Sequence, residues 1–332
     1  MPPKFRRPSF KDIEFAAGIH YPAFKTLPEI EKQAFAVHPT VPKTSFQRVS
    51  IPKRGDWMYE HAGESADSGQ SVKSYNRQSF KNYPHGPVET IEVVPVGTFD
   101  PLIAPPIHVL KEYLEIFFGC SVRVVKPVNV KVVAVSGLVD GEQLLCGDAF
   151  EYLRKRRCPR DVFASVCITM LDLTPGDDWN FVYGQAVMMD GVGVFSFARY
   201  SPNFHKGTNN ALSEEDHRRM LKKTCRTMAH EVGHIFGLRH CIYFKCIMNG
   251  NNGGANESSH FSLCPVCLQK ICSVMKENPI DIVGRYKALQ RFYSKYNWTR
   301  ESDWCGVRLE GLLKYSKHSL LKEPAGIGAT HL

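Results

Sequence analysis

The amino-acid sequence predicts an α/β fold built on a mixed, mostly parallel sheet. Between residues 90 and 173, runs of β-branched residues alternate with segments of helical periodicity, in the order β, α, β, α, β. A nearly continuous apolar run at 161–173 is typical of a central strand that is covered on both faces. The segment 179–200 alternates and is broken by glycines, which predicts a hairpin or a bulged edge strand.

Strands and helices alternate in the first half of this region. The strand TIEVVPVGTF, at 90–99, precedes a helix at 107–119 whose apolar residues recur at helical spacing and whose last residue is glycine. The segment SVRVVKPVNVKVVAV, at 121–135, is predicted to be rich in β-structure, although Pro127 interrupts it. A second helix is predicted over DAFEYLRKRRC, at 148–158.

A long helix follows the glycine-broken segment. Ser213 and the three acids after it form a capping-box-like start, in which a hydroxyl and a carboxylate meet unpaired amide donors. The helix should therefore extend from about 214 to 236, and another should begin near Pro265.

Composition and charge narrow the class of protein. The hydrophobic fraction of 43% is that of a globular protein in a chain of 332 residues. The formal charge is +9, but the densest basic run, 154–160, is typical of a solvated helix face, so nucleic-acid binding is not expected. The start MPPKFRRPSF has no apolar run behind it, which predicts a cytosolic or nuclear protein without a membrane anchor. The 11 cysteines should then be reduced thiols or metal ligands.

Histidines at the end of the long predicted helix indicate a metal site. His230 and His234 are four residues apart, so on a helix they lie about 40° from each other and one turn apart, within reach of one ion. Gly237 can adopt the left-handed conformation that ends a helix, which lets His240 turn back as the third ligand. Three neutral imidazoles suit Zn²⁺ and leave one position open for water.

Glu231 should lie beside this ion rather than bind it. Together these residues supply the parts for peptide hydrolysis: the metal lowers the pKa of bound water and polarises the scissile carbonyl. Glu231 would take the proton of that water and later pass it to the leaving amine. The alternatives are a closed metal site and a set of hydrogen-bonded core histidines without a metal. A closed site needs a fourth protein ligand, for which Glu231 is poorly placed.

Cysteines that directly follow the histidines indicate a second metal site. Cys241 and Cys246 form one pair, and Cys264 and Cys267 form a C-x-x-C pair after a loop rich in Asn and Gly. Two such pairs predict a tetrathiolate zinc site, which has no open position and is therefore structural. Because the first cysteine follows the third histidine, the two sites share backbone, and loss of the second should misplace that histidine.

The two motifs together resemble a known family. HEVGHIFGLRH, residues 230–240, is similar to the signature of the metzincin zinc metallopeptidases, and Met248 in CIMNG stands where they have a methionine beneath the metal. The cysteines narrow the resemblance to the archaemetzincins, whose signature places two cysteines (here Cys241 and Cys246), the methionine and then a C-x-x-C after the histidines. The resemblance extends from about residue 90 to 275.

This resemblance implies a metzincin-like catalytic domain, which we assign to 89–296. It implies a twisted mixed sheet, an antiparallel edge strand that lines the substrate cleft within 184–199, and an active-site helix beneath the cleft. Two Zn²⁺ per chain are expected, one catalytic and one structural. Met248 and Gly237 would support the catalytic zinc without binding it.

The resemblance says little about the two ends of the chain. Residues 1–88 mix prolines, charges and polar tracts without a sustained period, so we expect an arm that is partly disordered around 61–86. Residues 297–332 form a C-terminal extension, in which Trp298 and Trp304 should pack a closing segment.

The sequence departs from one pattern of the clan at Gly250. Astacin-like metzincins have a tyrosine there, two residues after the methionine, so the oxyanion must be stabilised by zinc itself or by another donor. Tyr243 and Arg199 are candidates. His205 and His217 precede the motif and could contact substrate, although a lone histidine near a helix start is more often a surface residue.

The leading hypothesis is a zinc-dependent peptidase, and the resemblance implies peptide or protein substrates, including short peptides cleaved near the N-terminus. The alternative is a catalytically silent, zinc-stabilised module that binds protein or nucleic acid. Glu231 argues against this alternative, because metal binding alone does not need its carboxylate. A zinc hydrolase acting on a non-peptide amide would use the same residues.

Overall fold

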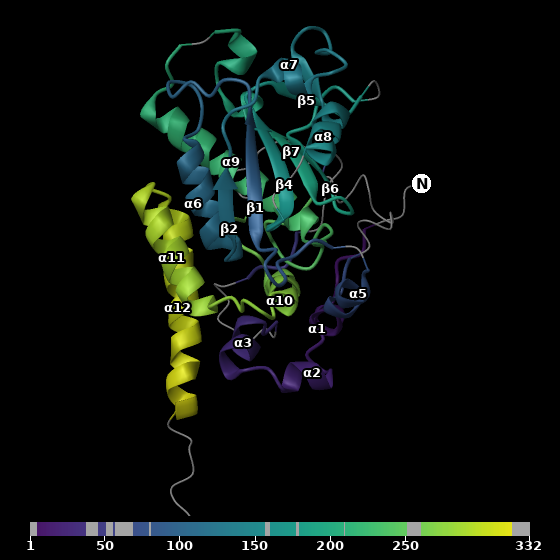
Figure 1. The fold of residues 1–332 in the computed structure, drawn as a ribbon. Coiled ribbons are helices and arrows are strands. Elements are labelled where there is room, and N and C mark those ends of the chain that lie inside the picture. Colours follow the sequence, from purple (N-terminus) through teal and green to yellow (C-terminus); the bar gives the residue numbers. More distant parts are fainter. Residues whose placement is uncertain are drawn as a thin grey trace, which may run out of the picture.

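The computed structural model describes residues 5–37, 46–50, 56, 69–79, 81–156, 160–176, 179–208, 210–250 and 260–320. In this part of the chain, a central sheet has helices on both faces, and a further group of helices lies beyond one end of the sheet (Figure 1). Among the described helices, none combines the length and apolar character needed to span a membrane.

The central sheet has five strands. Their spatial order is β2 (Ser121–Val124), β1 (Thr90–Val96), β4 (Val162–Thr169), β7 (Val192–Ser196) and β6 (Gly184–Val187). The pairings from β2 to β7 are parallel, and β6 pairs antiparallel with β7 at the edge. The predicted mixed, mostly parallel sheet with an antiparallel edge strand is confirmed. A separate pair of short parallel strands, β3 (Gln143–Leu145) and β5 (Asp172–Thr174), was not predicted.

Consecutive residues of the central strand β4 point to opposite faces of the sheet, as pleating requires. Val166 and Ile168 share a core with α6 (Ile107–Phe118) and α9 (Glu214–Ile235), whereas Cys167 packs on the opposite face with α8 (Cys146–Lys155). Because both faces are covered, β4 is buried apart from its first residue. The continuous apolar run in the sequence therefore indicated a central strand correctly.

Helix ends agree with the sequence signals. Gly119 ends α6 in the left-handed conformation, with φ of 70°. At the start of α9, the Ser213 hydroxyl accepts a hydrogen bond from the backbone N–H of Asp216. The predicted helix at 148–158 is present as α8, which begins at Cys146, and residues 157–159 lie outside the described part.

The predicted β-structure at 121–135 is only partly correct. Its first residues form β2, but Val130–Val133 form a short helix, α7. Pro127 has no N–H to donate to a strand ladder, and the Asn129 side chain accepts from the Lys131 N–H, which caps a helix instead. The β-branched composition of this segment was a wrong guide, because local capping decided its structure.

The arm and the C-terminal segment pack together beyond the sheet. The described part of the arm contains α1 (Phe10–Ala17), α2 (Pro22–Lys25), α3 (Glu29–Ala34) and α5 (Val72–Arg77). Helices α1 and α5 contact α10 (Pro265–Val274), and α3 contacts α11 (Ile282–Lys295) and α12 (Thr299–Leu320). Of the predicted disordered segment 61–86, residues 61–68 and 80 lie outside the described residues, and the remainder includes α5.

Both C-terminal tryptophans pack against other aromatic rings. Trp298 is buried against Phe261 and Tyr293, and Trp304 packs edge-on against Phe46 and Tyr286. They therefore close the C-terminal segment onto the rest of the chain rather than form an exposed stacking surface. The domain boundaries after residues 88 and 296 remain predictions.

Candidate active site and metal centres

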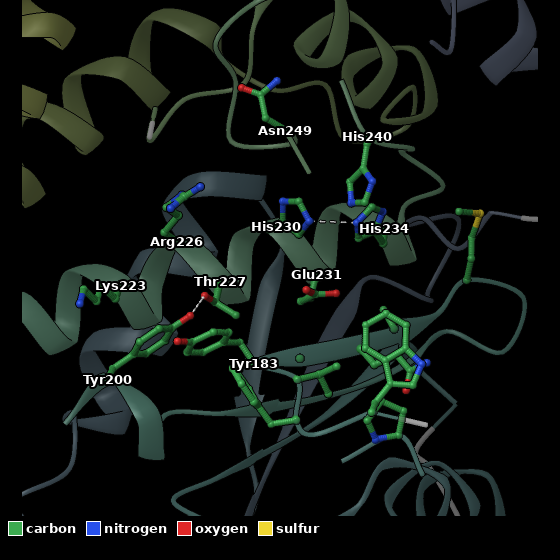
Figure 2. Close-up of a pocket in the computed structure, with 18 of the residues that line it drawn as sticks. Tyr183, Tyr200, Lys223, Arg226, Thr227, His230, Glu231, His234, His240 and Asn249 are labelled. Carbon is green, nitrogen blue, oxygen red and sulfur yellow. Dashed lines mark hydrogen bonds between the residues drawn. The ribbon is translucent and has the colours of Figure 1, made fainter. Parts of the chain in front are cut away.

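The C-terminal end of α9 presents three predicted site residues to one cavity. His230, Glu231 and His234 come from the helix, and His240 approaches from the segment that follows it (Figure 2). One ring nitrogen of each histidine lies within 4.8 Å of the others. Gly237 makes this possible, because its φ of 91° turns the chain back in a conformation that L side chains rarely adopt.

Hydrogen bonds hold the two helix histidines in a form suited to bind a metal. Nδ1 of His230 donates to the Ile247 carbonyl and Nδ1 of His234 donates to the Leu238 carbonyl, both at 2.7 Å. Burial, followed by the neighbouring histidines, holds the pKa of His230 well below its usual range, so this ring is neutral. Each Nε2 then carries a lone pair, yet the two Nε2 atoms are 3.0 Å apart.

Two lone pairs this close repel each other unless they share a cation. A zinc ion bound at about 2.0–2.1 Å from each nitrogen satisfies both, and His240 adds a third donor. The three-histidine set therefore fits Zn²⁺, which would have three protein ligands on the wall of the cavity.

Glu231 lines the same cavity, next to the start of the edge strand. A Cβ built on Gly184 would lie 3.1 Å from Glu231 Cγ, so the missing side chain lets β6 approach α9 closely. Burial raises the pKa of Glu231 to about 8. In the part of the chain that the structure describes, no hydrogen bond or ion pair engages its carboxyl group. A zinc ion at the histidines would favour the ionised form of this group, which can accept a proton.

The cavity has a volume of about 780 Å³ and is bounded by α9 on one side and by residues 179–188 on the other. Edge strand β6 lies within the range predicted to line the cleft. Several cavity-lining residues outside the histidine motif were not predicted from the sequence, namely Tyr183, Tyr200, Lys223, Arg226 and Asn249.

The residues considered as accessory groups lie elsewhere. Arg199 makes two hydrogen bonds of 2.7 Å to Asp172, and the hydroxyl of Tyr243 lies next to Gly69; neither residue lines the cavity. His217 contacts the Leu102 carbonyl at 3.0 Å, away from the cavity. The side chain of His205 lies outside the described residues.

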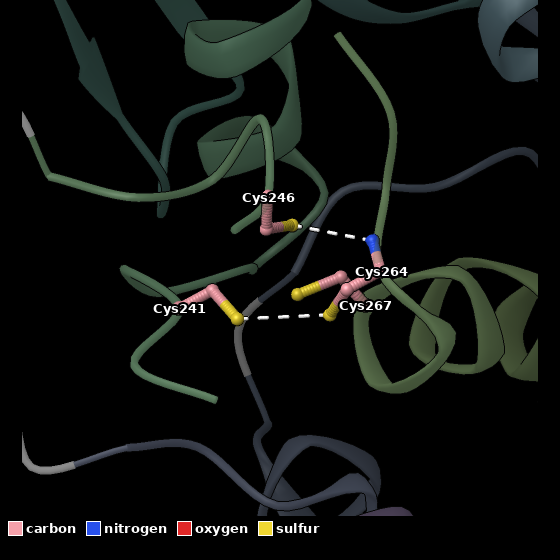
Figure 3. Close-up of side chains that lie close together, drawn as sticks. All are labelled: Cys241, Cys246, Cys264 and Cys267. Carbon is pink, nitrogen blue, oxygen red and sulfur yellow. Dashed lines mark hydrogen bonds between the residues drawn. The ribbon is translucent and has the colours of Figure 1, made fainter. Parts of the chain in front are cut away.

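The four predicted cysteine ligands converge in a buried cluster (Figure 3). The sulfurs of Cys241, Cys246, Cys264 and Cys267 all lie within 4.8 Å of one another. Sγ of Cys241 and Sγ of Cys264 are 3.6 Å apart, and sulfurs bound tetrahedrally to zinc at 2.3 Å would be about 3.8 Å apart. The backbone N–H of Cys264 donates to Cys246 Sγ at 3.3 Å, which stabilises a thiolate. This donor set fits a closed, structural zinc site, and Cys272 is not part of it.

The Met-turn lies against the histidine cluster. The carbonyl of Ile247 orients His230, and the buried Met248 packs beneath α9. A Cβ added to Gly233 would come within 2.5 Å of Met248 Sδ, so the glycine makes room for the methionine. Met248 thus supports the helix that carries the histidines and is not part of either donor set.

Asn249 connects the turn to the cysteine cluster. Its amide Nδ2 donates to the Cys241 carbonyl at 2.6 Å, and its Oδ1 accepts from the Cys246 N–H at 2.7 Å. The N–H of Cys241 donates to the Met248 carbonyl at 2.8 Å. Because His240 and Cys241 are adjacent, these bonds position the third histidine together with the sulfur cluster.

The N-terminal arm also braces the histidine segment. The buried side chain of Gln70 donates to the Gly237 carbonyl at 3.0 Å and accepts from the Arg239 N–H and from Nζ of the buried Lys270. The hydroxyl of Tyr75 donates to the Phe236 carbonyl at 2.8 Å. The arm thus completes the turn that delivers His240.

Replacing Gln70 with alanine should weaken zinc binding at the histidines and destabilise the fold by about 1–3 kcal/mol, because buried groups lose their partners. Zinc competition with a chromophoric chelator and chemical unfolding would measure the two effects. Gln33→Ala, which removes only an exposed bond to Glu29, is the matched control. Equal zinc affinity in wild type and Gln70→Ala would contradict a bracing role.

Comparison with known proteins places this site in a family. Residues 152–273 match Peptidase family M54. The chain is 33% identical over 280 residues to archaemetzincin-2 of Homo sapiens and 32% identical over 280 residues to that of Macaca fascicularis; each alignment covers 74% of both chains. The crystal structure of archaemetzincin from Methanopyrus kandleri matches with a TM-score of 0.43 and 23% identity, covering 58% of this chain and 98% of that one. On the identity and coverage of the sequence relatives, the chain belongs to the archaemetzincin family of zinc metallopeptidases.

Proposed function

We propose that the protein hydrolyses peptide bonds at a zinc ion held by His230, His234 and His240, with Glu231 as the general base. The observation that carries this proposal is the convergence of three histidine nitrogens and one unengaged carboxylate on the wall of a cavity. Zinc bound there would lower the pKa of a water molecule and polarise the scissile carbonyl. Glu231 takes the proton of the attacking water and delivers it to the leaving amine.

A second zinc, held by Cys241, Cys246, Cys264 and Cys267, has a structural role in this proposal. The four sulfur ligands are buried and none of these cysteines lines the cavity, which supports a closed site. Thiolate ligation requires reduced cysteines, so we place the protein in the cytosol or nucleus.

Short peptides are the proposed substrates, cleaved near the N-terminus. A cavity of about 780 Å³ lies in the range of sites that enclose small ligands, which supports a short substrate. Among the described strands, β6 pairs only with β7, so its other side offers backbone groups with which a peptide can pair.

Metal removal tests the proposed function. Purified protein should cleave members of a short-peptide library, lose this activity when a chelator removes zinc, and regain it when zinc is added back. The library should contain free and acetylated N-termini, so that the cleavage position reports the requirement for an amino group. If fully zinc-loaded protein cleaves no peptide, the catalytic proposal is wrong and the silent binding module is favoured.

A further inference from the structure

Two cations lie beside the histidine cluster on the same face of α9. Arg226 and Lys223 are four and seven residues before His230, so both share its helix face, one and two turns away. Both side chains line the cavity, and so does the side chain of Thr227, the residue after Arg226 (Figure 2). The cavity thus has a positively charged end on the N-terminal side of the metal ligands.

Arg226 differs from the other partly buried arginines near the sheet. Arg156 makes two hydrogen bonds to Glu92, and Arg199 makes two to Asp172. Within the described residues, neither an ion pair nor a hydrogen bond engages the guanidinium of Arg226. Burial lowers the pKa of Arg226 from its usual value, which is the cost of a charge without an anionic partner. A half-buried, unpaired cation that faces a substrate cavity is suited to pair with an anionic group of the substrate.

Aromatic rings form the wall opposite these cations. The rings of Tyr183 and Tyr200 stack with centroids 4.8 Å apart, and Nζ of Lys223 lies 5.9 Å above the ring of Tyr200. The hydroxyls of Tyr200 and Thr227 are hydrogen-bonded to each other (Figure 2). This fixed aromatic wall excludes water from one side, which strengthens a charge interaction at this end of the cavity.

The direction of β6 shows which part of a peptide would reach this end. Tyr183, just before β6, stacks on Tyr200, whose hydroxyl is hydrogen-bonded to Thr227 of α9. Gly184, the first residue of β6, lies next to Glu231, which is further along α9. After β6, Met188 and Gly237 both contact the side chain of Gln78. Strand β6 and helix α9 therefore run in the same direction.

A peptide paired antiparallel with β6 consequently runs from the Met188 end, over the metal ligands, toward Arg226 and Lys223. The residues after the scissile bond then lie at the cationic end.

We propose that Arg226 and Lys223 form a carboxylate-binding subsite for the part of the peptide that follows the scissile bond. This inference rests on the proposed peptidase function and specifies its substrate class: peptides with a carboxylate within one or two residues after the cleaved bond. That carboxylate belongs either to an Asp or Glu side chain or to the C-terminus of a di- or tripeptide. Arg226 binds it with its planar, multi-donor guanidinium, and Lys223 adds a second charge.

Matched peptides separate the two sources of the carboxylate. One series places Glu or Gln directly after the scissile bond, and each member carries either a free or an amidated C-terminus. Zinc-loaded wild type should cleave peptides with a carboxylate on that side about 10- to 100-fold more efficiently, in kcat/KM, than the neutral Gln amide. Preference for Glu in amidated peptides identifies a side-chain subsite, and preference for free over amidated Gln peptides identifies a C-terminal subsite.

Variants assign the preference to the two cations. Arg226→Gln should remove most of it, and Arg226→Lys should restore part of it. Lys223→Gln should have a smaller effect, because a lysine binds as a point charge. Arg219→Gln is the control for net charge. Arg219 lies on the same helix but is exposed and paired with Glu215, so its replacement should leave the preference unchanged.

A binding measurement distinguishes failure of this inference from failure of the proposed function. Calorimetry on the zinc-loaded Glu231→Gln variant should show tighter binding of the Glu peptides, and adding Arg226→Gln should abolish the difference. If wild type cleaves nothing but this difference is present, the subsite stands and the peptidase mechanism is wrong. If wild type cleaves the peptides equally with or without the carboxylate, the subsite is overturned. If it prefers peptides with an acidic residue before the scissile bond, the orientation of the bound peptide is overturned.

Discussion

Replacing Glu231 with glutamine is expected to lower kcat/KM for peptide hydrolysis by roughly 10²- to 10⁴-fold and to leave the zinc content unchanged. Glutamine keeps the shape of the side chain but cannot accept the proton of the attacking water. Zinc should remain, because the hydrogen bonds that orient His230 and His234 come from backbone carbonyls and do not involve Glu231. Steady-state kinetics and metal analysis of the same preparation measure both effects.

The matched control is Glu215→Gln, in the first turn of the same helix. Glu215 pairs with Arg219 near the surface and does not line the cavity, so this variant should retain wild-type activity. Activity of Glu231→Gln within about threefold of wild type would rule out Glu231 as the general base. Loss of zinc in that variant would instead assign it a role in metal binding.

Replacing Cys264 with serine is expected to release the structural zinc, lower the free energy of unfolding by on the order of 5 kcal/mol or more, and abolish hydrolysis. The loss of stability follows because the cluster joins the segment after His240 to the start of α10. Hydrolysis should be lost because the Cys241 backbone is bonded to Met248 and Asn249, which lie against the histidine cluster. Metal analysis, chemical unfolding and peptide cleavage report the three effects.

Cys272→Ser is the matched control, since Cys272 lies on the same helix α10 but outside the sulfur cluster. It should keep two zinc ions per chain and remain active. If Cys272→Ser lost a zinc ion and Cys264→Ser did not, the ligand assignment would be wrong. If Cys264→Ser lost one zinc but cleaved peptides normally, the two sites would not be coupled.

The parts of the fold and of the site that could be predicted from the sequence are those whose residues form a recognisable pattern along a short stretch of chain. The spacing from His230 to His240 is local, because a helix and one left-handed glycine determine it. The cysteine pairs are separated by a longer loop, yet their spacing is specific enough to predict the cluster at Cys241–Cys267. The alternating segment around β6 likewise indicated the edge of the sheet.

The parts that were missed depend on contacts between distant segments or on a signal that was not used. Gln70 bonds a carbonyl 167 positions away, and no local pattern indicates such a contact. Helix α7 formed where β-branched residues suggested a strand, because Asn129 supplies a cap. Lys223 and Arg226 were predictable in principle, since helical periodicity places them on the face of His230; their lack of acidic partners among the described residues is visible only in the structure.

The central claim is that the chain holds two zinc ions, one bound by histidines with an open position and one bound by four thiolates. Zinc analysis combined with X-ray absorption at the zinc edge, on wild type and His234→Ala, tests this claim most directly. Wild type should hold about two zinc ions with mixed nitrogen, oxygen and sulfur ligands. His234→Ala should remain folded and hold about one, bound by sulfur alone at about 2.3 Å. A single zinc in wild type bound by both histidine and cysteine, or an unchanged zinc count in His234→Ala, would contradict two separate sites.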